Sequence, residues 1–139
     1  MTAKLPLRIA AVVLFLFALG HTLGFPGFRP VERAALDVLD AMHTVPFNFG
    51  GRTTHWYDLY QGFGYAISVS GFVFPIIAWR LSTSSPAEAG LARFIAWLLC
   101  LIQVASIVLS LAFFGPVQAG FSAACAAILA WGALRLRPA

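Results

Sequence analysis

Four long apolar runs, separated by shorter stretches rich in polar residues, glycine and proline, dominate the pattern of the chain. The runs cover residues 5–23, 56–79, 91–113 and 116–134. Each is near the length of about 20 residues that an α-helix needs to cross the hydrocarbon core of a bilayer. The pattern therefore predicts an all-α membrane four-helix bundle, formed by one integral membrane domain over residues 1–139.

The connection between the first two runs contains a further periodic segment. In residues 31–42, apolar positions recur at helical spacing with four charged residues between them, which predicts a short amphipathic helix in the first loop. Its mixed charge and modest apolar face favour a position over the bundle or at the membrane interface. Residues 43–51 are rich in aromatic residues and glycine, and we expect a loop that dips toward lipid or covers a pocket.

The second run is the one around which the polar and small residues gather. Aromatic residues stand at both of its ends, as in the interfacial belts of membrane proteins. Gly62, Gly64 and Gly71 leave room for the close approach of a neighbouring backbone. We therefore expect this span to make the most contacts with the other spans.

The composition is typical of a membrane protein and argues against a nucleic-acid partner. Charged residues are 10% of the chain and hydrophobic residues 60%, whereas about a quarter of the residues in soluble domains are charged. The net charge of +4 comes from residues scattered at segment ends, without a block of basic residues interleaved with aromatics. Cys100 and Cys125 lie inside apolar runs, where a thiol usually acts as a small hydrophobic side chain, with a disulfide or a metal as the alternative.

The distribution of basic residues predicts the topology. One set lies at the ends of the runs that would share a side, namely Lys4, Arg8, Arg80, Arg93, Arg135 and Arg137, and the other set comprises Arg29, Arg33 and Arg52. The positive-inside rule then predicts a multi-pass membrane protein with both termini cytoplasmic. The first residues also resemble a signal peptide, but we expect a retained span.

With this topology, polar residues of all four spans meet near the outer face. An ionised carboxylate that faces lipid is costly, so Asp58 should face inward and lie close to His21 in one pocket. Histidine exchanges protons near neutral pH, so we take His21 and Asp58 as the catalytic candidates for acid–base chemistry. The ligand-binding candidates are His43, Arg52, His55, Trp56, Tyr60, Gln61, Tyr65, Gln103, Ser106 and Gln118.

Purely structural roles are the alternative for these residues. In the fourth span Gln118, Ser122 and Cys125 share one helical face, which a bundle would bury, and interhelical hydrogen bonds of this kind are worth roughly 0.6 kcal/mol each. His21 could equally cap the first span. No His-x-x-x-His or Cys-x-x-Cys spacing, nucleophile elbow, P-loop or dinucleotide fingerprint occurs, so we predict neither a metal site nor a cofactor.

Two segments resemble known membrane proteins. GHTLG at residues 20–24 and RTTHWYDLYQGFGY at residues 52–65 are similar to small bacterial four-span membrane proteins of uncharacterised function. This resemblance implies a location in the bacterial inner (cytoplasmic) membrane. The similarity rests on His21, Arg52, Trp56, Tyr60 and the segment Gly62-Phe63-Gly64. A looser resemblance is to compact membrane isomerases and cyclases of sterols and terpenoids, which implies carboxylate and histidine side chains in a bundle pocket, with Asp58 as the carboxylate.

These observations favour a pocket, polar at its outer end, that binds a lipid-like or isoprenoid small molecule. Whether the protein is an enzyme stays open; its chemistry would be isomerisation or another proton transfer. The alternative is a non-enzymatic membrane subunit or scaffold that packs through small-residue helix faces. The expected partners are membrane lipid and an apolar small molecule, and the small-residue faces also allow a homo-oligomer. Transport is a weaker alternative, because the last two spans contain no acid.

Overall fold

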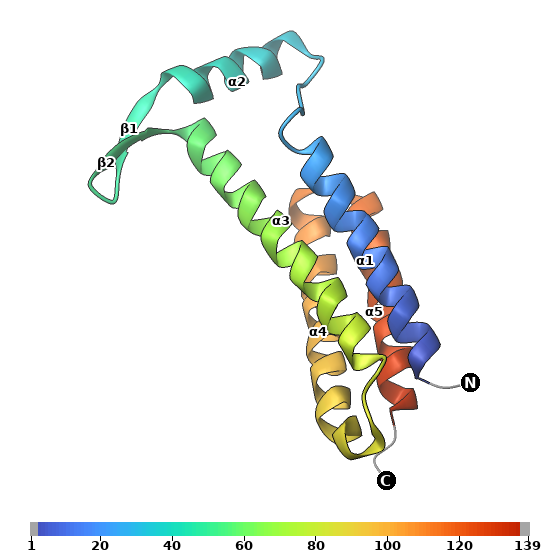
Figure 1. Cartoon of the computed structure of the whole chain (residues 1–139). Helices are drawn as coiled ribbons and strands as arrows, with labels where there is room; N and C mark the ends of the chain where they lie inside the picture. Colours follow the sequence, from blue (N-terminus) through green and yellow to red (C-terminus); the bar gives the residue numbers. More distant parts are fainter. Residues whose placement is uncertain (1–2, 137–139) are drawn as a thin grey trace. The chain divides into compact units, whose positions relative to one another are not determined.

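The computed structural model describes residues 3–136 and is all-α, apart from one hairpin. Within these residues, four helices are long and apolar enough to cross a membrane. They are α1 (Lys4–Gly24), α3 (Trp56–Leu81), α4 (Ala89–Phe113) and α5 (Pro116–Arg135) (Figure 1). Every boundary lies within two residues of the predicted run. The predicted membrane four-helix bundle is confirmed, with the short helix α2 (Arg33–Thr44) between the first two spans.

The contacts divide the chain into two compact units. Unit 1 contains residues 1–16 and 72–139, and unit 2 contains residues 17–71. Helices α1 and α3 each contribute residues to both units.

The core of unit 1 is built largely from small side chains. Its buried residues are Leu7, Ala10, Ala11, Leu14, Ala78, Leu81, Ala92, Ala96, Leu99, Cys100, Cys125, Ala126, Leu129, Ala133 and Leu136. Seven of these fifteen are alanine, so helix backbones approach closely and associate by van der Waals packing, which is the main attraction between helices in lipid. Gly132 extends this principle, because a Cβ there would lie 2.7 Å from Cδ2 of Leu7.

Among the described helices, α4 and α5 share the most extensive contact. A tight turn joins them, as the sequence predicts: Gly115 has a φ of 114°, which favours glycine, and Pro116 occupies the first helical position of α5. The amides of Phe114 and Gly115 both donate to the carbonyl of Ser110. The expectation that α3 makes the most contacts is therefore wrong, since the short turn holds α4 and α5 along each other.

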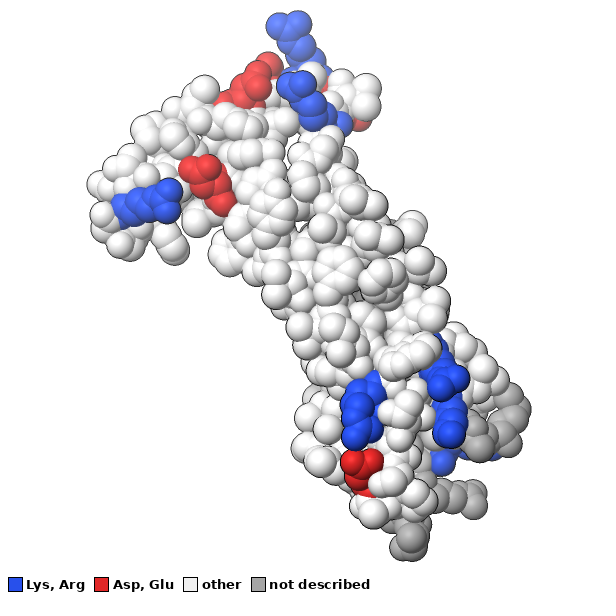
Figure 2. Space-filling view, viewed as in Figure 1, with Lys and Arg blue, Asp and Glu red and all other residues white. Residues whose placement is uncertain are grey.

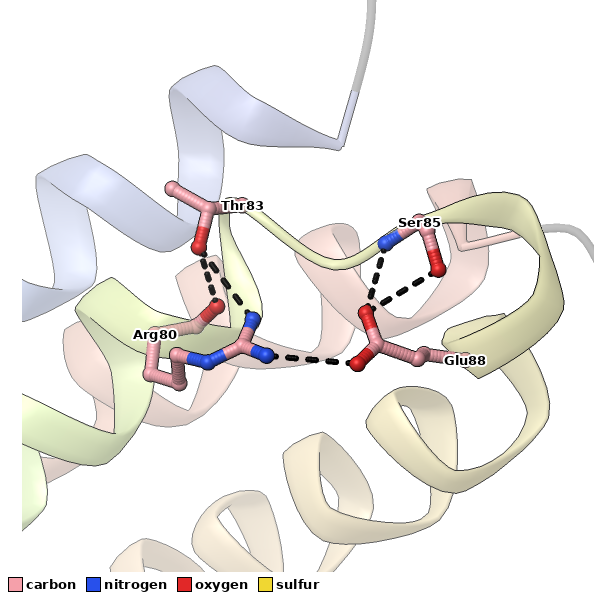
Figure 3. A network of polar contacts seen from close by, with 4 residues as sticks. All are labelled: Arg80, Thr83, Ser85 and Glu88. Atoms are coloured by element: carbon pink, nitrogen blue, oxygen red, sulfur yellow. Dashed lines mark hydrogen bonds and ion pairs between the residues drawn. The ribbon is translucent and has the colours of Figure 1, made fainter.

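A network around Glu88 shapes the connection from α3 to α4 (Figure 3). Nη2 of Arg80 lies 3.2 Å from Oε1 of Glu88, and Nη1 donates to the hydroxyl of Thr83. The other carboxylate oxygen of Glu88 accepts from the amide and the hydroxyl of Ser85 at 2.9 and 3.0 Å. Exposed ion pairs add little stability, so the network mainly fixes the path of the chain into the 3₁₀ turn η1 (Pro86–Glu88) and α4.

In unit 2, the amphipathic segment forms α2 two residues later than the predicted range of 31–42. Glu32 is in an extended conformation and its carbonyl accepts from the amides of Ala35 and Leu36, so the helix begins after it. The helix continues to Thr44 and ends before Pro46, because the residue preceding a proline is disfavoured in α conformation. No residue of α2 is buried, and its position at the membrane interface stays a prediction.

The aromatic segment after α2 is a β-hairpin rather than a loop. Strands β1 (Pro46–Phe49) and β2 (Arg52–His55) pair in antiparallel register around Gly50 and Gly51. Both glycines have positive φ, 58° and 81°, as a two-residue type I′ turn requires. The sequence signal was present in the Gly-Gly pair between a phenylalanine-rich and a threonine-rich segment.

In unit 2, the predicted close approach of a neighbouring backbone is confirmed at Gly71 of α3, whereas Gly64 makes room for a side-chain ring. The ring of Phe25 occupies the space where a Cβ of Gly64 would stand, and a Cβ at Gly71 would lie 3.2 Å from that of Ala18. No described residue lies within 4 Å of a Cβ at Gly62, so the prediction is wrong there. Gly64 therefore leaves space for the ring of Phe25, which lies in the chain after α1.

Gly64→Ala should lower the free energy of unfolding by about 1–3 kcal/mol, because the ring of Phe25 must move to admit the methyl group. Gly62→Ala is the matched control and should be neutral or stabilising by up to about 1 kcal/mol, since alanine is the better helix former. Thermal unfolding in detergent measures both. Equal stability of the two variants would contradict the contact between Phe25 and Gly64.

Candidate functional site

Unit 2 contains a cavity of about 210 Å³ next to α2. It is lined by Pro26, Gly27, Phe28, Arg29, Leu39, Asp40, His43 and Tyr57. Three segments meet here: the irregular chain after α1, the C-terminal half of α2 and the first turn of α3. Four residues with ionisable side chains, Arg29, Asp40, His43 and Tyr57, are thus among the residues that line the cavity.

His43 is held in one orientation by its own helix and by a ring of α3. Its Nδ1 lies 2.8 Å from the carbonyl oxygen of Leu39, and its ring stacks on that of Tyr57 with centroids 3.7 Å apart. A carbonyl oxygen can only accept, so Nδ1 carries the hydrogen and Nε2 of the neutral ring has the free lone pair. Nε2 is therefore the atom with which His43 can take a proton from a bound molecule.

Tyr57 and Gln61 form a second polar group one helical turn apart on α3. Nε2 of Gln61 donates to the hydroxyl oxygen of Tyr57, which leaves the phenol hydrogen free to donate elsewhere. Among the described residues, the buried Oε1 of Gln61 has no hydrogen-bond partner. Buried polar atoms are nearly always satisfied, so this oxygen marks a position where a donor from outside the described chain would be stabilised.

Sequence reasoning selected His43 and Gln61 but missed Arg29, Asp40 and Tyr57. Within residues 3–136, neither Arg29 nor Asp40 takes part in an ion pair, so both charges are available to a ligand. Tyr57 could have been found from its position four residues before Gln61, on the same helical face. Arg29 and Asp40 could not, because their meeting depends on the path of the chain between α1 and α2.

His21 lies in a different environment of unit 2. Its Nδ1 is 3.2 Å from the hydroxyl of Ser68, which is buried, and its ring stacks on Phe25 with centroids 5.3 Å apart and an interplanar angle of 5°. Phe25 in turn contacts Tyr60 at 4.9 Å and the edge of Tyr65 at 6.1 Å. His21 is thus part of an aromatic cluster between the end of α1 and α3.

Asp58 caps the first turn of α3. Its Oδ2 accepts from the backbone amide of His55 at 3.0 Å and from the hydroxyl of Thr54 at 3.1 Å, and it lies 3.3 Å from Nδ1 of His55. A carboxylate three residues into a helix that reaches back to the amide before the helix is half of a capping box. The Asp58 side chain is 57% exposed, so it pairs in contact with water rather than in a closed pocket.

The expected pairing of His21 with Asp58 is therefore replaced by separate partners. His21 contacts Ser68, and Ser68 is ten residues beyond Asp58 in α3, a separation of about 15 Å along a helix at 1.5 Å per residue. Counted from the predicted ends of the two spans, His21 and Asp58 were expected at the same depth in the membrane. This expectation failed because α3 begins almost at Asp58, whereas α1 continues past His21 to Gly24.

The other candidates of unit 2 lie around the hairpin and the first turns of α3. Arg52 is exposed and opposite Phe49 in the hairpin, and His55 is half-buried beside Asp58. Trp56 stacks on Phe47 with centroids 4.3 Å apart. The hairpin is thus fastened to α3 by ring contacts.

Three candidates belong to unit 1. Gln103 is buried, and the hydroxyl of Ser106 donates to the carbonyl of Ile102 in its own helix. Ser122 and Cys125 are buried as their shared face predicts, but Gln118 is exposed. It lies in the first turn of α5, next to the bend at Gly115, where the face is no longer covered. A ligand-binding role of Gln103, Ser106 and Gln118 stays a prediction.

Within residues 3–136, no group of three or more His, Cys, Asp or Glu side chains could hold a metal ion. No protein family, curated protein or solved structure matches the chain. The function must therefore be inferred from the side chains of the two units.

Asp58→Ala should lower the unfolding temperature in detergent, because it leaves the amide of His55 and the hydroxyl of Thr54 without their acceptor. Asp58→Asn retains an acceptor oxygen and should restore most of the loss. Asp37→Ala, at an exposed position of α2, is the control and should change little. If Asp58→Ala unfolds at the wild-type temperature, the cap does not contribute to stability.

Proposed function

We propose that this membrane protein binds the polar end of a lipid-like or isoprenoid molecule in the cavity of unit 2. The observation that carries the proposal is the convergence of Arg29, Asp40, His43 and Tyr57 on one small cavity. Ligand sites combine a few convergent polar groups with apolar walls, and here Pro26, Phe28 and Leu39 supply the walls.

The size of the cavity limits what it can hold. At about 210 Å³, it is smaller than the roughly 300–1,000 Å³ of sites that enclose a whole drug-sized ligand. It suits a headgroup, while the apolar body of the ligand would lie along exposed aromatic surface of unit 2. That surface includes Phe28, Phe49, Trp56, Phe63 and Tyr65.

The lining favours a headgroup with both an acceptor and a donor. Arg29 offers donors to an anionic or carbonyl oxygen, and the Asp40 carboxylate accepts from a hydroxyl or amine. For chemistry at this site, we propose proton transfer through Nε2 of His43, with the phenol of Tyr57 as a donor. This reaction class includes the isomerases that the sequence resembles.

For the location, we propose the bacterial cytoplasmic membrane with both termini in the cytoplasm and unit 2 at the outer face. In unit 1 the described residues include five basic side chains and one acid, Glu88. Figure 2 shows blue residues and a red one gathered at one end of this unit. Unit 2 has three basic residues and four acids. The positive-inside rule assigns the basic end of unit 1 to the cytoplasm.

Cysteine labelling tests this orientation. A membrane-impermeant maleimide should label Asn48→Cys, at an exposed position of strand β1, on intact cells, and should label Ser84→Cys only after the cells are opened. Cys100 and Cys125 are buried and give little background. Labelling of Ser84→Cys on intact cells would show the opposite topology.

A second candidate function is that of a scaffold or oligomeric subunit. On α5, Ala119 and Ala126 are buried in the bundle, whereas Gly120, Ala123 and Ala127 are exposed. Within residues 3–136, nothing lies within 4 Å of a Cβ at Gly120. Exposed small residues at this spacing permit close contact with a helix of another protomer, so a homo-oligomer through α5 is the alternative proposal.

Organic extraction of the purified protein, followed by mass spectrometry, tests the binding function. Arg29→Gln should lower the yield of co-purified amphiphile about tenfold or more, because a hydrogen bond to a charged group contributes roughly 1.5–3 kcal/mol. His43→Phe should retain the stack on Tyr57 and still lower the yield. Arg33→Gln, on α2 and outside the cavity lining, should have no effect. Equal yields from Arg29→Gln and Arg33→Gln, together with a dimer in solution, would favour the scaffold.

A further inference from the structure

Unit 1 has an apolar groove of about 350 Å³ between its parts of α1 and α3. It is lined by Ala11, Val12, Phe15, Pro75, Ile76 and Trp79. Ala11 and Pro75 are buried and form the floor, because neither side chain is large enough to fill the space between the helices. Val12, Phe15, Ile76 and Trp79 are between 45% and 68% exposed and form the open sides.

Both ends of the groove are defined by a contact between the two helices. At one end the rings of Phe15 and Phe72 meet edge to face with centroids 5.8 Å apart. At the other end the guanidinium of Arg8 lies over the ring of Trp79, 5.1 Å from its centroid. Each helix advances seven residues between these contacts, about 10 Å at 1.5 Å per residue. The groove is therefore a short apolar channel with a cation at one end.

Arg8 has spare hydrogen-bonding capacity. Within residues 3–136, its guanidinium makes no hydrogen bond or ion pair, and its contact is the face of Trp79. Arg80, by contrast, already pairs with Glu88. Lys4 precedes Arg8 by one helical turn and lies on the same face of α1. A guanidinium with free N–H groups, next to a second cation, is suited to a phosphate.

We propose that this groove binds a membrane phospholipid with an anionic headgroup. One acyl chain lies between Ile76 and Val12 over the floor of Ala11 and Pro75. The phosphate accepts hydrogen bonds from Arg8, and Lys4 adds charge near the membrane surface. The site is separate from the cavity of unit 2 and does not depend on the function proposed for it.

Charge favours a lipid over a second copy of the chain as the occupant. In the described part of unit 1, the charges are those of Lys4, Arg8, Arg80, Arg93, Arg135 and Glu88. The one carboxylate is already paired with Arg80. A second copy with its basic end at the same membrane surface would bring like charges together, whereas an anionic lipid neutralises them.

Quenching of Trp79 fluorescence by brominated lipids tests the site in nanodiscs, which offer the lipid from both sides of the bilayer. The other tryptophans are replaced with Trp56→Phe, Trp97→Phe and Trp131→Phe, and the probes are dibrominated phosphatidylglycerol and phosphatidylcholine. Phosphatidylglycerol should quench at a lower mole fraction. Arg8→Gln should reduce this preference about fivefold, the factor that follows from about 1 kcal/mol per basic residue near an anionic surface.

Matched variants separate the groove from general effects. Arg93→Gln removes a charge from α4 outside the groove and should retain the preference. Val12→Phe should fill the groove and reduce quenching by both lipids, whereas Val104→Phe, at a similarly exposed valine of α4, should not. Should the triple tryptophan variant fail to fold, native mass spectrometry of the wild type, Arg8→Gln and Arg93→Gln compares retention of the two lipids.

Three results would overturn the proposal. Equal quenching by the two lipids would mean that Trp79 meets only bulk bilayer lipid. An equal loss of preference in Arg8→Gln and Arg93→Gln would mean that diffuse charge, and not the groove, selects the lipid. If brominated lipid does not quench Trp79 and the protein is dimeric in the nanodisc, a second copy covers the groove.

Discussion

Close approach between helix backbones is the constraint on which both units depend. Lipid removes most of the hydrophobic drive for one helix to join another, so the helices must gain their attraction from contact area at short distance. In unit 1 this area comes from the alanines of the core and from Gly132, against which Leu7 packs. In unit 2 Gly71 allows the same approach to Ala18, whereas Gly64 makes room for the ring of Phe25.

The ionisable residues near the helix ends are explained first by the backbone. Asp58 accepts from the amide of His55 and Glu88 accepts from the amide of Ser85, in each case a carboxylate reaching back three residues. The first amides of a helix have no partner within it, and an acid at this position satisfies one of them. An aspartate in the first turn of a span is therefore evidence for a helix start before it is evidence for catalysis. The capping contacts of Asp58 account for its position without a catalytic role.

The sequence predicted the helices well and the contacts between side chains distant in the chain poorly. Span length, the glycine turn before Pro116 and the amphipathic segment are local properties, and the structure agrees with them to within two residues. The hairpin was also local, and its Gly-Gly signal was available. By contrast, the cavity depends on where the chain from Pro26 to Arg29 turns toward α2, which no periodicity encodes. The pairing of His21 with Ser68 instead of Asp58 depends on how far α1 extends relative to α3.

The two proposed sites differ in charge, and this difference argues for different ligands. The groove of unit 1 is apolar along its length and ends at cations, which gives it no means to choose among headgroups beyond their negative charge. The lining of the cavity of unit 2 includes both Asp40 and Arg29, and a carboxylate repels a phosphate that a guanidinium attracts. A bulk anionic lipid should therefore prefer the groove, whereas the cavity requires a headgroup that offers a donor to Asp40 as well as an acceptor to Arg29. For this reason we propose that selection of a particular ligand, and proton transfer by His43, take place in the mixed-charge cavity.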